Sequence, residues 1–520
     1  MDSFLSAARA RAIDAAPQEH PGIKITVAAS PPPGAGQMLP ARTLARLARS
    51  LAFSSLIEHF DRCAVRPAGS AMVTNKAVGI NEPLLAVPLK NCWTVAAAKA
   101  CAPLAALGDG PLESIAPESL LAFHMLIVKA QRERDAEPTP RSNHIELLSA
   151  TPVETLWDWS ASELGLLQGS KWALAPAWSR QSAVDELDEY SHYPPLKAML
   201  DAHGIDEATF LWARQAVAVR MMRFEAADAS EPALLVVAPG VDLLTTPGGS
   251  GGNASGVGGV GVFAVEASSL VVRAPHAYAE GDEVSLCCGD GLSNGRRLLS
   301  GGASVVHANA SDSVELAFTL PLHPAAMQVY SLLQDGLEGA IPSAVRGNPF
   351  AHGELDLMPT EFLDSAGEGA NEVMLHVRLG GGSGASEQLA RIIQFFQADI
   401  LGRAVAQQGE SGALTLESLT TPGTEQLAVT KLRDALANML AAYGAAAVTA
   451  DGAATADAGG SSLARDEAAL GALEAAAADS PSAESTVVRR RRLALHVLVG
   501  EKRILQHALD VLRDWFEDPI

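Results

Sequence analysis

The stretch from Leu234 to Ala303 limits what this chain can fold into more than any other part of the sequence. It opens with an apolar run typical of a buried strand, which ends at a Pro239-Gly240 break. A short helical turn carrying Asp242 follows. Beyond a glycine-rich loop and further strand-like segments, a tight turn around Gly281 leads to a predicted strand and to a short helix from about Asn294. This order predicts a part of the chain built from short β-strands.

The glycine-rich loop from Gly248 to Gly261 contains the letters GVGGVG, which have the spacing of a dinucleotide-binding fingerprint. No predicted strand leads directly into the loop, and the sequence after it is typical of a strand instead of a helix. The chain also has no Gly-Lys-Ser/Thr phosphate-binding sequence. We therefore interpret the loop as an insertion and exclude a nucleotide site there.

The composition of the chain limits the kinds of partner that this protein is expected to bind. The 520 residues are 48% hydrophobic, which indicates a globular chain of two or three domains. The net charge of −22, from 60 acidic and 38 basic residues, argues against a nucleic-acid surface because such a surface needs clustered positive charge. No apolar run is long enough to cross a bilayer, so no membrane partner is predicted.

The cysteines predict a reducing compartment. There are five of them, an odd number, and no Cys-x-x-Cys spacing occurs, so no structural zinc site or other metal site is predicted. The adjacent pair Cys287-Cys288 is interpreted as a buried strand end.

The opening stretch resembles the SET domain of the Rubisco large-subunit lysine methyltransferase family. In that family the first run ends in an aspartate followed, two residues later, by Asn-His-Ser, and the second run ends in a Ser-Asn pair, a short helix and Tyr-Gly-Phe. Asp242, Gly281 and Ser293-Asn294 match this pattern. Thr245-Thr246 stand where Asn-His is expected, and Gly301 stands where the tyrosine is expected.

The resemblance runs from about residue 46 to the end of the chain and implies an α+β fold. A β-rich SET core with knot-like threading is expected over residues 46–320, with a helical insert at about 118–232. An all-α lobe is expected over 321–520, with a low-complexity insert at 444–485. Residues 1–45 are interpreted as a tail or targeting segment, and a chloroplast location is favoured over cytosol or nucleus.

Two phrases outside the opening stretch also match the family. The phrase from Glu163 to Trp172 resembles one in the family's helical insert, and Gly500-Glu501-Lys502-Arg503 resembles one in the closing helix of its substrate-binding domain. The resemblance thus implies that the C-terminal lobe binds a protein substrate or partner. We interpret the basic run Arg489 to Arg492 as a solvated helix start.

The resemblance also implies S-adenosyl-L-methionine as cofactor. Gly69 matches the glycine turn that approaches the cofactor's methionine half, although a plain β-hairpin would explain it too. Arg220 borders the buried stripe of a predicted helix from Asp206 to Phe224, where a half-buried guanidinium needs an anion. That anion is the cofactor's carboxylate by the resemblance, or an internal aspartate or glutamate.

Three functions follow from the resemblance. An active protein-lysine N-methyltransferase needs a neutral lysine and a preorganised pore, but Gly301 supplies no hydroxyl there. Thr245 would replace some hydrogen bonds of the family's asparagine, and Thr246 keeps the backbone contacts of its histidine. We therefore predict weak methyl transfer, with a catalytically degenerate partner-binding subunit or a cofactor sensor as alternatives.

Overall fold

The computed structural model describes residues 52–68, 71–134, 137–150, 154–224, 232–244, 262–284, 292–301, 311–321, 362–363, 372–380, 422–443, 463–479 and 485–517, together with the single residues or pairs 286, 305, 309, 389–390, 392–393, 396–397 and 400. The chain divides into two compact units, Met1–Leu44 and Ala45–Ile520, and every described residue belongs to the second. The expected targeting segment and the glycine-rich loop up to residue 261 lie outside the described residues.

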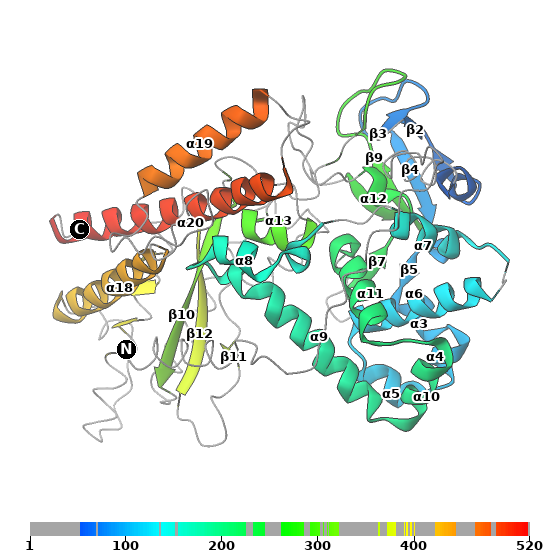
Figure 1. The fold of residues 1–520 in the computed structure, drawn as a ribbon, viewed down its shortest axis with the longest axis horizontal. Coiled ribbons are helices and arrows are strands. Elements are labelled where there is room, and N and C mark those ends of the chain that lie inside the picture. The colour runs from blue at the N-terminus through cyan, green and yellow to red at the C-terminus, as the bar shows by residue number, and fades with distance from the viewer. Residues whose placement is uncertain are drawn as a thin grey trace, which may run out of the picture. The chain divides into compact units, whose positions relative to one another are not determined.

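The SET-type part is built from short antiparallel strands (Figure 1). A four-stranded sheet has the order β1 (Arg62–Cys63), β4 (Pro83–Pro88), β9 (Ser269–Arg273) and β8 (Phe263–Glu266). A hairpin joins β2 (Val65–Ala68) to β3 (Ala71–Thr74), and a second sheet has the order β5 (Trp93–Thr94), β7 (Leu234–Val237) and β6 (Met222–Phe224). Strands distant in sequence therefore pair, as β4 does with β9.

The predicted turn at Gly281 is confirmed and joins two parts of this core. Gly281 has φ +87°. Val78 and Tyr278 form a β-bridge on one side of the turn, and Val73 bridges Glu283 on the other. Beyond the turn, the Leu286 backbone N–H donates to the Leu244 carbonyl at 2.8 Å. The segment after the turn thus runs beside the short helix that carries Asp242.

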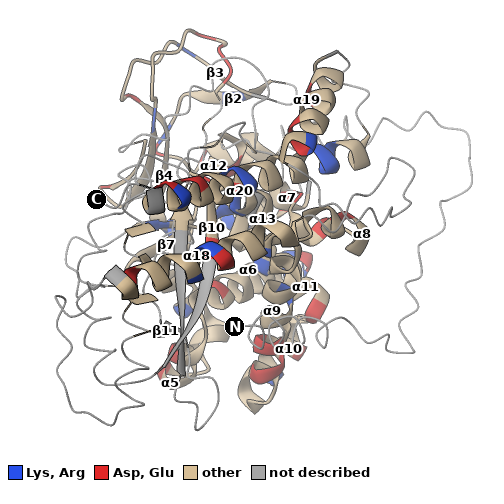
Figure 2. Ribbon diagram, turned by 90° about the vertical axis from the view of Figure 1, so that its left-hand side faces the viewer, with Lys and Arg blue, Asp and Glu red and all other residues tan. Residues whose placement is uncertain are grey.

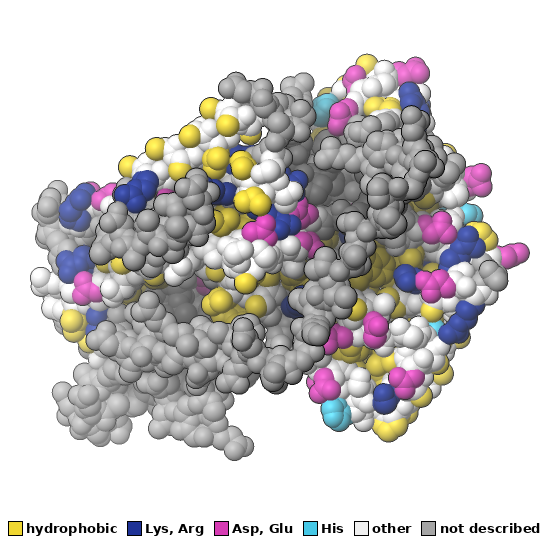
Figure 3. Space-filling model, in the orientation of Figure 1, with side chains coloured by type: hydrophobic (Ala, Val, Ile, Leu, Met, Phe, Trp, Pro, Cys, Tyr) yellow, Lys and Arg dark blue, Asp and Glu magenta, His cyan; other side chains and the backbone are white. Residues whose placement is uncertain are grey.

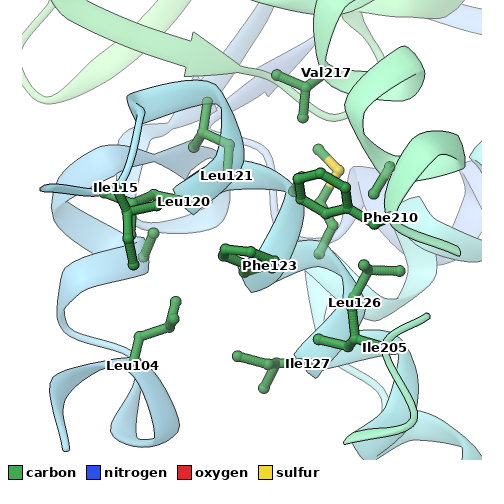
Figure 4. Close-up of a cluster of buried hydrophobic side chains, with 14 of the residues drawn as sticks. Leu104, Ile115, Leu120, Leu121, Phe123, Leu126, Ile127, Ile205, Phe210 and Val217 are labelled. Carbon is green, nitrogen blue, oxygen red and sulfur yellow. The ribbon is translucent and has the colours of Figure 1, made fainter. Parts of the chain in front are cut away.

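The helical part of the fold holds a core of its own and begins before residue 118, where the insert was expected to start. Its helices are α3 (Val95–Lys99), α4 (Ala102–Ala105), α5 (Asp109–Ser114), α6 (Pro117–Glu133), α7 (Pro140–Ala150), α8 (Ala161–Leu164), α9 (Ala175–Ser191), α10 (Pro194–His203) and α11 (Glu207–Arg220), with 3-10 turns η1 (Leu89–Asn91), η2 (Leu156–Asp158), η3 (Gly165–Leu167) and η4 (Lys171–Ala173). Phe123 of α6 stacks on Phe210 of α11 with ring centroids 5.1 Å apart (Figure 4). His124 is buried against this core.

The helix predicted from Asp206 to Phe224 ends earlier than its apolar periodicity indicates. The side chain of Asp206 caps its start by accepting a hydrogen bond from the Thr209 backbone, in a capping box. The helix ends at Arg220, because the next residues pair as strand β6 with β7, Met222 opposite Val236. Tertiary pairing overrides the helical pattern in these last residues.

The C-terminal part contains a sheet as well as helices, so its description as all-α was wrong. Strand β10 (Ser313–Pro321) pairs along its whole length with β12 (Glu372–Gly380), and β11 (Phe362–Leu363) joins the other side of β12. Helices α18 (Pro422–Ala442) and α20 (Thr486–Glu517) contact one another along this part of the fold (Figure 1). The boundary expected at residue 320 falls inside β10.

The insert expected at 444–485 contains a helix that packs on the last one. Helix α19 (Leu463–Asp479) lies against α20. Asp466 of α19 forms an ion pair with Lys502 of α20, and both side chains are buried. The low-complexity pattern therefore does not prevent helix formation in 463–479, because Asp466, Glu467 and Glu474 of α19 pair with Lys502, Arg503 and His496 of α20. Figure 2 shows acidic and basic residues on both helices.

Helix α20 also contacts the helical insert, which corrects the interpretation of Arg489–Arg492 as solvated. Arg490 forms ion pairs with Glu154 and Glu163, both at 2.6 Å, and its side chain is only 13% exposed. Arg489 also pairs with Glu154. The two phrases matched separately in the sequence meet here, since the Ser170 hydroxyl donates to the Glu501 carboxylate at 3.1 Å.

Helix α13 (Asn294–Gly301) packs on α20, α11 and the 3-10 turns of the insert. The knot-like threading, which would bring residues 299–303 beside 241–246, stays a prediction, since 245–246 and 302–303 lie outside the described residues. Among the helices described, none is long and apolar enough to cross a membrane.

Candidate functional site

The site forms where the second sheet meets helices α7, α11 and α12 (Val241–Leu244). Strand β7 ends at Val237, and the chain then turns through Gly240 into α12. Gly240 has φ +81°, and a Cβ atom there would lie 3.1 Å from the Phe60 ring, so a side chain would strain the backbone and require the ring to shift. This glycine break turns the chain so that Asp242 follows directly after the buried strand.

Arg220 and Asp242, both predicted to bind the cofactor, contact each other. Arg220 is the last residue of α11, and its Nε donates to Asp242 Oδ2 at 3.2 Å. The two side chains are 9% and 7% exposed. The structure therefore supplies the internal carboxylate that the sequence offered as the alternative partner of Arg220.

His144, which the sequence analysis did not single out, completes the site. It lies on α7, is fully buried, and its Nε2 is 3.5 Å from Asp242 Oδ1. Its Nδ1 accepts a hydrogen bond from the Trp93 indole at 2.8 Å. Because an indole N–H can only donate, this bond places the ring proton on Nε2, facing Asp242.

The contact between His144 and Asp242 is looser than a well-formed hydrogen bond. A distance of 3.5 Å lies beyond the usual range for N–H···O, and neither His144 Nε2 nor Asp242 Oδ1 has a hydrogen-bond partner of good geometry among the described residues. We treat it as an electrostatic contact that leaves Asp242 Oδ1 with unused acceptor capacity.

The electrostatics keep Asp242 ionised. Burial by itself disfavours the charged form, but the contacts of Asp242 with His144 and Arg220 outweigh it and lower the pKa of Asp242 to about 2. The geometry assigns the larger part of this effect to Arg220, since the Trp93 bond leaves His144 singly protonated. The site thus holds a buried carboxylate beside a guanidinium.

Trp93 is fixed from several sides. Arg141 of α7 donates to the backbone carbonyls of Cys92 and Lys90, at 3.0 and 2.7 Å, and its guanidinium lies 5.9 Å from the indole centroid. The position of His144 is therefore set by strand β5 as well as by its own helix.

The other predicted site residues are not brought into this group. Gly69, Thr245 and Thr246 lie outside the described residues. Gly301 is the last residue of α13, so the position expected to hold the family's tyrosine is a helix end. Tyr278 is buried among the apolar residues of the β core, and its hydroxyl has no hydrogen-bond partner among the residues described.

Arg214, nearly two turns before the end of α11, is a second half-buried arginine of this helix, and its partners are different. It pairs with Glu186 at 3.5 Å and donates to the Ser119 hydroxyl at 2.9 Å. Both partners belong to the helical insert. This arginine therefore has a structural role.

Solved structures with a similar fold exist. The chain matches the SET domain of LSMT bound to lysine and AdoHcy with a TM-score of 0.58 and 15% identity, over 92% of this chain and 93% of that one. It matches Rubisco LSMT bound to AdoMet with a TM-score of 0.56 and 15% identity, over 92% of both chains. This chain has the Rubisco LSMT fold. No family model and no curated protein matches the sequence.

The LSMT fold includes the C-terminal part, because the match covers nearly all of both chains. At 15% identity it does not fix the chemistry of the site, which depends on individual side chains. Among the described residues, no group of three or more His, Cys, Asp or Glu side chains lies close enough to hold a metal ion. The buried Arg220–Asp242 pair offers a donor and an acceptor side by side to a ligand that carries both a carboxylate and an ammonium.

Proposed function

We propose that this chain binds S-adenosyl-L-methionine at the Arg220–Asp242 site. One observation supports this proposal most strongly. In a chain with the LSMT fold, a guanidinium and a carboxylate are buried together, with Arg220 Nε 3.2 Å from Asp242 Oδ2. The amino-acid end of S-adenosylmethionine has both charges. Its carboxylate would pair with Arg220 and its ammonium with Asp242, whose Oδ1 retains acceptor capacity.

By class the activity is protein-lysine N-methylation, with slow turnover. The bound sulfonium supplies the methyl group. The chain must align a neutral lysine nitrogen with that methyl in a dry channel, because an exposed lysine has a pKa of about 10.4 and stays charged. Gly301, at the end of α13, contributes no hydroxyl to such a channel. A lost hydrogen bond to the transition state costs roughly 2–4 kcal/mol, so we expect weak transfer.

Calorimetric titration with S-adenosylmethionine tests the binding site. Arg220→Ala should weaken binding about 10- to 100-fold, which corresponds to losing one charge-assisted hydrogen bond. Arg214→Ala is the matched control, since it removes a half-buried arginine from the same helix and should leave the dissociation constant unchanged. Equal affinity of the wild type and Arg220→Ala would rule out this site.

A methyl-transfer assay tests the activity. The wild type, given labelled S-adenosylmethionine and a lysine-bearing protein, should transfer slowly. Gly301→Tyr alone should not restore fast transfer, because Thr245 and Thr246 still replace the family's Asn-His pair. Rapid transfer by the wild type would contradict the expected loss of activity. It would show that another group, such as Tyr278, has taken the role of the missing tyrosine.

The second candidate is a catalytically degenerate SET-fold protein that binds a partner through its C-terminal lobe. The helical end at Gly301 favours it, because that position has lost the only side chain expected to act on the lysine. Absence of S-adenosylmethionine binding to the wild type would select this candidate. Binding without any transfer would select a cofactor sensor.

A further inference from the structure

The buried contacts of Asp242 extend beyond the ion pair with Arg220. Trp93 donates to His144 Nδ1 at 2.8 Å, His144 Nε2 faces Asp242 Oδ1 at 3.5 Å, and Asp242 Oδ2 accepts from Arg220 at 3.2 Å. The four side chains come from β5, α7, α12 and α11. Each element supplies one member, so the chain of contacts links the second sheet to the helix that carries Arg220.

His144 controls one of the two carboxylate oxygens. Arg220 Nε fixes Oδ2. His144 Nε2 faces Oδ1 at 3.5 Å, and Oδ1 has no hydrogen-bond partner of good geometry among the described residues. A carboxylate held at one oxygen can rotate about its χ2 angle, which is a broad and soft torsion. A donor facing the second oxygen limits that rotation and therefore sets the direction in which Asp242 presents its acceptor.

The orientation of His144 is itself fixed. Its side chain is fully buried, and the Trp93 bond determines both the ring position and the tautomer. Leucine at this position would fill most of the space but would remove the donor. Glutamine would keep an amide N–H in place of Nε2–H. The two substitutions therefore separate packing from hydrogen bonding.

We propose that His144 is a positioning residue that aligns Asp242 to receive the ammonium group of S-adenosylmethionine. This inference rests on the proposed function. It assigns to His144 a role in affinity for the amino-acid end of the ligand and none for the adenosine end. It also predicts that the ligand-free Arg220–Asp242 geometry depends on the Nε2 proton of His144.

Titration with two ligands tests the role in binding. His144→Leu should bind S-adenosylmethionine about tenfold more weakly than the wild type and should bind 5′-methylthioadenosine, which lacks the amino-acid end, equally well. His144→Gln should recover most of the lost affinity. His496→Leu is the matched control, because it removes another buried histidine that faces a carboxylate, Glu474 at 3.3 Å, away from the site.

The outcomes separate this inference from the proposed function. Unchanged S-adenosylmethionine affinity in His144→Leu, or equal weakening for both ligands, would overturn the positioning role while leaving the proposed function in place. If the wild type binds no S-adenosylmethionine, the proposed function fails, and with it the ammonium-binding role assigned to His144. Crystal structures of ligand-free His144→Leu and His144→Gln would then test the geometric part, with a rotated Asp242 carboxylate expected only in the leucine variant.

Discussion

At the scale of single residues, the buried charges of this protein are held by named partners. Asp242 contacts Arg220 and His144, Lys502 contacts Asp466, and Glu501 accepts hydrogen bonds from Ser170 and Tyr443. A buried charge without such a partner costs several kcal/mol, which explains why each lies where two or more elements meet.

Asp242→Asn should destabilise the protein by about 3 kcal/mol, because it leaves the guanidinium of Arg220 buried without its carboxylate. Chemical denaturation at neutral pH measures this. Asp201→Asn is the control, since Asp201 pairs with Lys197 at the surface and its side chain is 66% exposed. A surface pair of that kind contributes about 1 kcal/mol or less. Equal losses in the two variants would contradict a stabilising role for the buried pair.

Glu501 should make stability fall as the pH rises. Burial raises the pKa of Glu501 to about 7 from 4.5, and the charge of Asp312 adds to this against the hydrogen bonds from Ser170 and Tyr443. The native state thus binds the proton more tightly than the unfolded state. The stabilisation is present below pH 4.5 and is lost between pH 4.5 and 7, by about 3 kcal/mol.

Glu501→Gln should remove that part of the pH dependence when the free energy of unfolding is measured from pH 5 to 8. Ser170→Ala should extend the loss to higher pH, because the Ser170 hydroxyl stabilises the ionised form. A pH profile of Glu501→Gln that matches the wild type would show that another group is responsible.

At the scale of elements, α19 is held on α20 mainly by charge. Asp466, Glu467 and Glu474 pair with Lys502, Arg503 and His496. Leu470 is the only fully buried leucine of α19. The outward side of this helix carries hydrophobic side chains, many of them alanine methyl groups (Figure 3). The buried pair Lys502–Asp466 lies near the start of α19.

Lys502→Met and Asp466→Leu should each lower stability by about 3 kcal/mol, since each leaves one charge buried. The double variant should recover most of that loss, because two apolar side chains replace both charges. A double-mutant cycle by denaturation, with hydrogen exchange of α19 as a second readout, measures this. Arg503→Gln removes a half-exposed pair with Glu467 and should cost less than about 1 kcal/mol. Additive losses in the double variant would contradict direct pairing.

At the scale of the whole molecule, the helical insert and the C-terminal part share a core. Leu156, Leu167 and Trp172 of the insert pack with Leu493 and Val497 of α20. The ion pairs of Arg489 and Arg490 and the Ser170–Glu501 hydrogen bond surround this cluster. Buried side chains from the helical insert and from the C-terminal part therefore join the two parts expected from the sequence.

This shared core predicts that residues 45–520 unfold in one cooperative transition. Differential scanning calorimetry should show a single peak, and Leu493→Ala should move the whole peak to lower temperature, because it removes packing that both parts need. Two separate peaks, of which Leu493→Ala shifts only one, would show that the parts fold independently.

The residue pattern was sufficient to predict local structure in segments whose conformation depends only on their own residues. The turn at Gly281, the break at Gly240 and the start of α11 at Asp206 follow from backbone freedom and capping, and the structure confirms them. The resemblance carried by Asp242 and Gly281 also predicted the fold shared with Rubisco LSMT.

Only the tertiary structure decided which of these segments meet. His144 has no motif around it, and its importance arises because β5 and α12 lie on its two sides. The early end of α11, the sheet of β10 and β12, and the order of α19 likewise depend on partners distant in the sequence. Residue spacing along a chain determines local periodicity, whereas a buried charge pair or a strand pair forms only when the fold places both members within contact distance.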